Sequence, residues 1–529
     1  MLSHDILHER LEQLNAIGIS LSCENHIDKL METILIAAKH LVNADAGTLY
    51  LIKGGALHFE IVITESLGIA LGGTTGHPTN LPPVMLRHTD GTPNLNNVVA
   101  CSVNKDTTIN IKDAYTAEGY DFSGTKRFDS SVGYRSKSFL TVPMKNHERE
   151  IIGVLQLINA RDEQGQLSHF DADSQSMAES LASQAAIALT NRRLIHQLEE
   201  LFESFINLIN LAIDDKSPYT GGHCQRVPAL TVMLAEAVNY ATYGPMADFT
   251  MDNQGRYELK IAGLLHDCGK ITTPVHVVDK ATKLQTIFDR IQLVDTRFEV
   301  LARDAEIDFL RGKCTEEEWK QRVAQIEADK AFLQHANTGG EFMPDTACER
   351  VRTIGQQQWI NPEGILSPFL SAEEIENLSI ARGTLTAAER QIINHHIEVT
   401  IEMLESLPWP KHLKNVAEFA GGHHERMDGK GYPRGLTKNQ MSVQARIMGI
   451  ADVFEALTAR DRPYKDGMKI SQSLTILARM AKDQHIDGDL FEIFVKEKVW
   501  KNYAELFLGP SQIDEVDEEK LLRISRGQD

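Results

Sequence analysis

The spacing of hydrophobic and polar residues changes several times along the first third of the chain. Between residues 26 and 42 apolar side chains recur every three or four positions, which predicts an amphipathic helix. Short runs rich in strand-forming residues and parted by turn residues then predict strands at residues 47–52, 56–63, 138–144 and 151–158. The helical spacing returns at residues 171–189. Strands between flanking helices predict an α+β domain over residues 1–190.

After this domain the spacing alternates regularly between four and three. The apolar residues of the segment 191–213 are Leu194, Leu198, Leu201, Phe205, Leu208 and Ala212. This is a heptad seam, which suits a parallel two-helix coil and hence a homodimer. The same spacing also fits a plain amphipathic helix that packs on its own domain, and the pattern leaves both interpretations open.

The rest of the chain, residues 205–510, has mostly helical spacing. A charged stretch at about residues 284–383 divides it, with apolar residues three or four apart from Ile287 to Ala305. Thr315 and the glutamates after it predict a further helix start. We expect a hairpin of two long helices there, with a structural or interface role. The chain is therefore predicted to be multidomain, an α+β domain followed by an all-α domain with a helical insert.

Composition narrows the possible partners and compartment. The formal net charge is −20, which disfavours a nucleic-acid polymer as partner. The six cysteines form no C-x-x-C pair, as expected for reduced thiols in the cytoplasm. The first residues lack a basic segment followed by an apolar core, and no apolar run approaches the roughly 18 residues of a membrane span. We expect a cytoplasmic protein that does not cross a membrane.

Histidines and aspartates recur inside apolar stretches of the helical half. They are His223, His266, Asp267, His396, His423, His424 and Asp452. A single buried histidine or aspartate would be interpreted as a core residue with a hydrogen-bond partner. Without a metal, so many of them would leave several buried polar groups unpaired, which is energetically costly. Fe²⁺ and Mn²⁺ accept mixed imidazole and carboxylate ligands, and the set exceeds what one ion needs. We predict two divalent metal ions, and His423 and His424, whose side chains diverge, could serve different ions or different sides of one site.

Two runs in the first domain resemble a GAF domain, most closely the branch found in cyclic-nucleotide phosphodiesterases. They are FDSSVGYRSKSFLTVPM at 128–144 and IIGVLQLINARD at 151–162. Such domains often bind a small ligand in a pocket over the sheet. The asparagine-lysine-phenylalanine pattern of nucleotide-binding members is incomplete, because Ala160 and Arg161 follow Asn159. The resemblance implies a sensory domain that binds a ligand or serves for dimerisation.

The helical half resembles an HD-GYP domain, the branch of the HD phosphohydrolase superfamily that hydrolyses cyclic di-GMP. The motifs that carry this resemblance are His223, HDCGK at 266–270, HHERMDGKGYPRGL at 423–436, Asp452 and RPYK at 462–465. It implies the same seven metal ligands, with Asp267 bridging and with His396 rather than His395. Some members bind a third metal through a carboxylate at the position of Tyr219, so two ions are expected here.

The resemblance also implies roles for the cationic and aromatic residues near the metals. Lys270 follows Asp267 by three residues and would neutralise a phosphoryl oxygen or protonate the leaving 3′ oxygen. Arg462 and Lys465 would hold the other phosphate. Tyr432 would stack on the substrate or merely pack.

The glycine-rich run after the histidine pair is expected to form a tight loop. Gly431 and Pro433 would fix its turn. Glu425 and Asp428 are interpreted as hydrogen-bond partners of histidine N–H groups. In the family this loop serves recognition and partner binding, including diguanylate cyclases.

The sequence thus predicts a GAF-regulated phosphodiesterase with two Fe or Mn ions that converts cyclic di-GMP to pGpG, GMP or both. One alternative is hydrolysis of 3′3′-cyclic GMP-AMP. Another is a non-catalytic module that binds a cyclic dinucleotide or a cyclase. A general HD nucleotidase is disfavoured by the intact HHE…GYP block.

Overall fold

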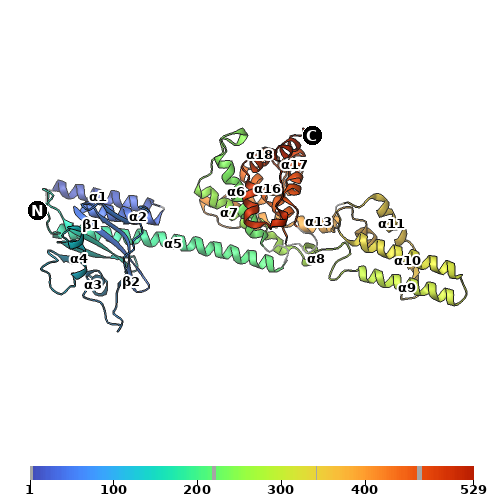
Figure 1. The fold of residues 1–529 in the computed structure, drawn as a ribbon, viewed down its shortest axis with the longest axis horizontal. Coiled ribbons are helices and arrows are strands. Elements are labelled where there is room, and N and C mark those ends of the chain that lie inside the picture. The colour runs from blue at the N-terminus through green and yellow to red at the C-terminus, as the bar shows by residue number, and fades with distance from the viewer. Residues whose placement is uncertain (1–3, 25, 217–221, 341, 461–466, 529) are drawn as a thin grey trace. The chain divides into compact units, whose positions relative to one another are not determined.

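The computed structural model describes residues 4–24, 26–216, 222–340, 342–460 and 467–528. It divides into two compact units, Met1–Phe202 and Glu203–Asp529 (Figure 1). No helix within these described ranges has both the length and the apolar character needed to cross a bilayer.

An antiparallel sheet of seven strands forms the centre of the first unit. Its order is β3-β2-β1-β7-β6-β5, with β4 beside β2. The strands are β1 (Ala44–Lys53), β2 (Ala56–Thr64), β3 (Ile69–Gly72), β4 (Val84–Met85), β5 (Ile109–Ile111), β6 (Phe139–Lys145) and β7 (Ile151–Ala160). The four long strands are those that the sequence predicted, and the prediction of an α+β domain is confirmed.

Helices cover both faces of this sheet. They are α1 (His4–Cys23), α2 (Ile27–Leu41), α3 (Val98–Lys105), α4 (Ser123–Val132) and the start of α5 (Ala172–Lys216). Apolar residues of α2 and α5, such as Ile34 and Leu181, pack against Leu155 of the sheet in the main core. The opposite face packs on α3, where Cys101 and Phe139 are buried together.

Helix α5 is longer than the sequence pattern suggests. Asp171 accepts a hydrogen bond from the backbone of Ser174 and so caps its first turn. The helix then continues for 45 residues, so nothing separates the predicted domain end at 190 from the predicted linker. Its heptad positions Leu194, Leu198 and Leu201 are exposed, with Leu198 at 64%.

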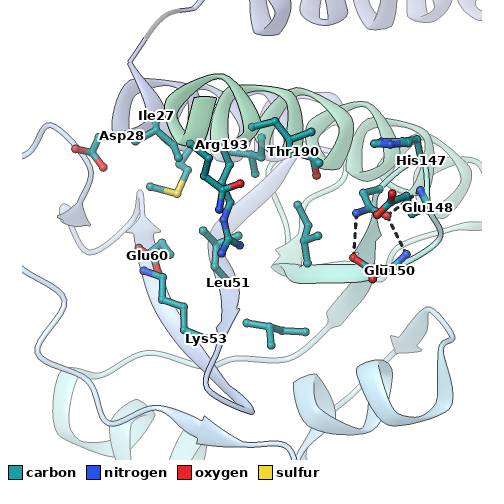
Figure 2. A pocket seen from close by; sticks show the side chains of 17 residues that line it. Ile27, Asp28, Leu51, Lys53, Glu60, His147, Glu148, Glu150, Thr190 and Arg193 are labelled. Atoms are coloured by element: carbon teal, nitrogen blue, oxygen red, sulfur yellow. Dashed lines mark hydrogen bonds and ion pairs between the residues drawn. The ribbon is translucent and has the colours of Figure 1, made fainter. Parts of the chain in front are cut away.

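A pocket of about 700 Å³ opens in the first unit between α2, α5 and the sheet. Figure 2 shows Thr190 and Arg193 of α5 on one side and Lys53 and Glu60 of the strands on another. Lys53 Nζ and Glu60 Oε1 form an ion pair of 2.5 Å. Both apolar and charged side chains therefore line the pocket, and α5 contributes part of this lining.

The second unit is helical around a buried core. Its helices outside the insert are α6 (His223–Tyr240), α7 (Asn253–Leu265), α8 (Val275–Val278), α13 (Ala387–Asn394), α14 (His396–Glu405), α15 (Val416–Gly421), α16 (Val443–Thr458), α17 (Ile470–Lys482), α18 (Gly488–Lys496), α19 (Val499–Phe507) and α20 (Glu518–Ser525). Short 3₁₀ turns complete it, of which η2 (Cys268–Thr272) directly follows the His-Asp pair. The predicted all-α domain is confirmed.

The insert contains more than the expected helical hairpin. Its elements are α9 (Ile291–Leu310), α10 (Glu316–Asn337), α11 (Asp345–Gly355), β8 (Gln358–Ile360), β9 (Leu366–Pro368) and α12 (Ala372–Leu378). They enclose an apolar core of their own that includes Phe298, Leu333 and Phe369. Next to its two ends, the Thr384 hydroxyl donates to the carbonyl of Lys280 at 2.8 Å.

Candidate metal centre

Helix ends bring the seven predicted ligand residues together. His223 opens α6, His266 and Asp267 follow α7, and His396 opens α14. His423 and His424 follow α15, and Asp452 lies within α16. The turn after Asp267 packs directly on α14, because a Cβ on Gly269 would lie 2.0 Å from the His396 carbonyl oxygen. Only glycine permits this close approach.

The side chains form two groups whose ligand atoms lie within 4.8 Å of one another. One group holds His223, His266 and Asp267, and the other holds His396, His423 and His424. The adjacent pair therefore shares one group, with ring centroids 4.1 Å apart. Of the two possibilities for this pair, the geometry favours different sides of one site over different ions.

The carboxylate of Asp267 lies between the two groups. Its Oδ2 is 3.3 Å from Nε2 of both His223 and His266, and its Oδ1 is 3.3 Å from Nε2 of His396. Asp452 Oδ1 joins the first group, 3.3 Å from His223 Nε2 and 3.8 Å from His266 Nε2. A carboxylate that offers one oxygen to each group has the placement of a bridging ligand.

Hydrogen bonds at Nδ1 orient most of these rings. His266, His396 and His423 each bond through Nδ1 to the carbonyl three residues earlier, at 2.7, 2.5 and 2.6 Å. A carbonyl only accepts, so Nδ1 carries a proton and Nε2 is the ring nitrogen that would bind a metal.

A second observation, the burial of ligand atoms without hydrogen bonds, also indicates that the site suits a metal ion. Asp267 Oδ1, His396 Nε2 and His423 Nε2 are fully buried and make no hydrogen bond among the described residues. Buried polar atoms without partners are costly and uncommon. Their convergence with further imidazole nitrogens matches the nitrogen and oxygen ligands of borderline divalent ions.

Burial and the neighbouring carboxylates shift the pKa values of His266 and His424 in opposite directions. Burial alone would lower the pKa of His266, but Asp267 outweighs this and raises it to about 9. Burial lowers the pKa of His424 to about 4, against the opposing charge of Asp452. Burial opposes the ionised form of Asp267, yet Lys270 and His266 hold its pKa well below the usual range. His424 thus offers a neutral imidazole, and Asp267 stays ionised.

Lys270 lies at this carboxylate. Its Nζ donates to Asp267 Oδ2 at 2.5 Å, and 23% of its side chain is exposed. Burial would lower the pKa of Lys270, but the charges of Asp267 and Asp452 raise it. The lysine is therefore cationic, which suits charge neutralisation of a phosphoryl oxygen.

The interpretation of Glu425 and Asp428 as partners of histidine N–H groups is wrong. Glu425 is buried and accepts from the backbone N–H groups of Arg434 and Leu436 at 2.7 and 2.9 Å. Asp428 accepts from Arg426 at 2.9 Å. Backbone carbonyls already satisfy Nδ1 of His266, His396 and His423, whereas the glycine-rich loop needs acceptors for its own N–H groups.

The loop of Gly431 and Pro433 stands against the second histidine group. The ring of Tyr432 stacks on His424, with centroids 4.8 Å apart and planes at 25°. A Cβ on Gly431 would lie 2.4 Å from the backbone N of Arg426, so the loop folds tightly onto the chain before it.

His395, which the motif set aside in favour of His396, is exposed and pairs with Glu398 at 2.6 Å. Arg462, Lys465 and Tyr219 lie outside the described residues.

Glu455 is a residue that the motifs missed. It is 1% exposed and its Oε2 bonds His223 Nδ1 at 2.5 Å. Its spacing of three from Asp452, which puts both on one face of α16, was the available signal.

Family comparisons agree with this architecture. A family model described as a GAF domain matches residues 26–189, and one described as an HD domain matches residues 371–490. The chain contains a GAF domain and an HD domain. The HD match includes His396, His423, His424 and Asp452, while His223 and the His-Asp pair precede it.

Three similar proteins act on cyclic dinucleotides according to their names. 3′3′-cGAMP-specific phosphodiesterase 1 of Vibrio cholerae is 28% identical over 190 residues, 35% of this chain and 42% of that protein. 3′3′-cGAMP-specific phosphodiesterase 3 of the same organism is 40% identical over 95 residues, 18% of this chain and 20% of that protein. A cyclic di-GMP phosphodiesterase of Pseudomonas aeruginosa is 36% identical over 114 residues, 22% of this chain and 26% of that protein. The chain thus spans less than half the length of each of these relatives.

Proposed function

We propose that this protein is a metal-dependent phosphodiesterase that hydrolyses a cyclic dinucleotide. The observation that carries the proposal is the pair of ligand groups that share the Asp267 carboxylate, with fully buried acceptor atoms directed between them. The names of the similar proteins support the substrate class. Cyclic di-GMP is the leading substrate and 3′3′-cyclic GMP-AMP the alternative, with linear pGpG or mononucleotide as product.

The residues fit two divalent ions, with Fe or Mn the candidates. His223, His266 and Asp452 would hold one ion, His396, His423 and His424 the other, and Asp267 both. Such a pair supplies Lewis-acid stabilisation of the phosphoryl oxygens and a water acidified to neutral pH. Lys270 would pair with a phosphoryl oxygen from its position beside Asp267. Tyr432 would border the substrate where its ring covers His424.

The test is a product assay on anaerobically purified protein with measured metal content. We expect hydrolysis of at least one of the two cyclic dinucleotides, and loss of both metal and turnover in Asp267→Asn. Turnover that persists in Asp267→Asn without metal would contradict the proposal. Binding of the dinucleotide by metal-loaded wild-type protein without any product would instead support the non-catalytic module.

We also propose that the GAF domain regulates turnover through the pocket in Figure 2. Helix α5 lines that pocket through Thr190 and Arg193, and the same helix buries Ile206 and Ile213 in the second unit. Occupying the pocket would act on a helix common to both units. Thr190→Trp, which fills the pocket, is expected to change turnover at least twofold with unchanged metal content. Unchanged turnover in that variant would contradict this route of regulation.

A further inference from the structure

His223 is oriented differently from the buried histidines around it. His266, His396 and His423 use carbonyls three residues earlier along the chain. His223 is the first residue of α6, and its Nδ1 bonds a side chain from a distant helix instead of a carbonyl. A side chain takes that place, because Glu455 Oε2 lies 2.5 Å from His223 Nδ1.

Glu455 is itself held by a second residue. Its other oxygen, Oε1, accepts from Nε of Arg226 and pairs with the terminal nitrogen Nη2, both at 2.7 Å. A carboxylate that is 1% exposed needs this compensation, because an unpaired buried charge is strongly destabilising. Arg226 lies one turn after His223 on α6, so the two residues reach the same carboxylate from one face.

The backbone before His223 leaves room for this guanidinium. Gly222 precedes α6 with φ of 86°, and a Cβ there would lie 2.5 Å from Nη1 of Arg226. A larger residue would both strain the backbone and displace the arginine. The glycine, the arginine and the glutamate together therefore fix where the His223 ring stands.

We propose that Glu455 is a positioning residue that holds the His223 ring so that Nε2 faces Asp267 and Asp452, and that Arg226 keeps Glu455 in place. With Nδ1–H donating to Glu455, Nε2 is the ring nitrogen that faces the two aspartates, each 3.3 Å away, and that would bind the metal they share. The proposal rests on the proposed metal-dependent function and assigns the pair Glu455–Arg226 to the metal site of the first group only.

The test is binding of Mn²⁺ to the full chain, followed by electron paramagnetic resonance. Wild-type protein is expected to bind two ions that give an exchange-coupled signal. Glu455→Gln keeps the shape of the side chain and removes its charge. We expect it to weaken one ion about 10- to 100-fold, so that substoichiometric Mn²⁺ gives only an uncoupled signal. High Mn²⁺ should restore the coupled signal.

The matched control is Glu374→Gln in the insert. Glu374 is also buried and pairs with a single arginine, Arg297, at 2.8 and 2.9 Å. The control removes the same kind of ion pair but should keep both Mn²⁺ affinities. If Glu455→Gln does not fold, Arg226→Lys replaces it, because it retains the charge and loses the double contact with Oε1. A smaller weakening of the same ion is then expected.

The outcomes separate this inference from the proposed function, because Mn²⁺ binding requires no turnover. Wild-type affinity for both ions in Glu455→Gln, or equal weakening in Glu374→Gln, would overturn the positioning role. A wild-type protein that binds no Mn²⁺ pair would overturn it as well. If wild type binds the pair and Glu455→Gln weakens one ion, the inference stands even where no cyclic dinucleotide is hydrolysed.

Discussion

At the residue scale, Lys270 and Asp267 form a close contact between opposite charges in the candidate site. Their atoms Nζ and Oδ2 are 2.5 Å apart, and the same Oδ2 faces His223 and His266. The lysine therefore opposes the negative charge of Asp267, and 23% of its side chain remains exposed.

Lys270→Met is expected to lower kcat about 100-fold or more while both metals remain bound. The reason is that a fixed cation beside developing charge contributes several kcal/mol to transition-state stabilisation. Steady-state kinetics with metal analysis on the same samples checks this. A kcat within threefold of wild type would show that Lys270 serves only to hold Asp267.

His424 should make the free energy of unfolding of the metal-free protein depend on pH. Its pKa is about 4 in the folded chain against an ordinary value of 6.5, so the unfolded state binds the proton more readily between these values. The free energy of unfolding should therefore fall by up to about 3 kcal/mol as pH drops from 6.5 to 4.

Urea unfolding followed by tryptophan fluorescence measures this fall. All four tryptophans lie after residue 203, so the signal reports the second unit. His424→Gln should lose the part of the pH dependence that belongs to His424. The same slope in both proteins would contradict the prediction.

The sequence motifs predicted which residues belong to the site better than they predicted the contacts that those residues make. The seven ligand candidates are one set in the sequence and two groups in space, since the grouping depends on how α14 and α15 approach the Asp267 turn. The roles of Glu425 and Asp428 were misjudged because local spacing does not show which backbone N–H groups a loop leaves unpaired. Glu455 escaped notice because its partner His223 is 232 residues away.

At the scale of elements, the glycine-rich loop is a tightly constrained segment of the site. A methyl group on Gly431 would lie 2.5 Å from Glu425 Cα and 2.4 Å from the Arg426 nitrogen. Gly431→Ala should therefore displace the loop, lower stability by about 2–4 kcal/mol and reduce turnover, because Tyr432 would leave His424.

Gly488→Ala is the control for this substitution. A Cβ at Gly488 meets nothing within 4 Å, and the residue begins α18. Its stability and turnover should match wild type, measured by urea unfolding and product assay. Wild-type behaviour of Gly431→Ala as well would show that the loop yields without cost.

Elements were predictable where local pattern and tertiary burial agree. The long strands β1, β2, β6 and β7 are rich in strand-forming residues, whereas β4 has two residues and no readable pattern. The end of the GAF domain at 190 was placed where the helix spacing changes register, but no helix-breaking residue stands there and α5 continues.

At the scale of the whole molecule, the exposed seam of α5 is the strongest sign of assembly. Leu198 and Leu201 are 64% and 52% exposed, and their heptad spacing suits pairing with an identical helix. Leu198→Glu is expected to convert a homodimer to a monomer, as measured by light scattering. Glu199→Gln, one position off the seam, should leave the mass unchanged, and a wild-type monomer would refute the pairing.

The hydrogen bond between Thr384 and Lys280 also has a consequence for the insert. Because these two residues touch at 2.8 Å, the hundred residues between them leave and rejoin the HD domain at nearly one point. The insert also keeps its own core around Phe298 and Phe369. We therefore expect the segment to be removable: joining Lys280 to Thr384 through a two- or three-residue turn should leave the remaining helices of the second unit folded, and other domains could be grafted at the same junction.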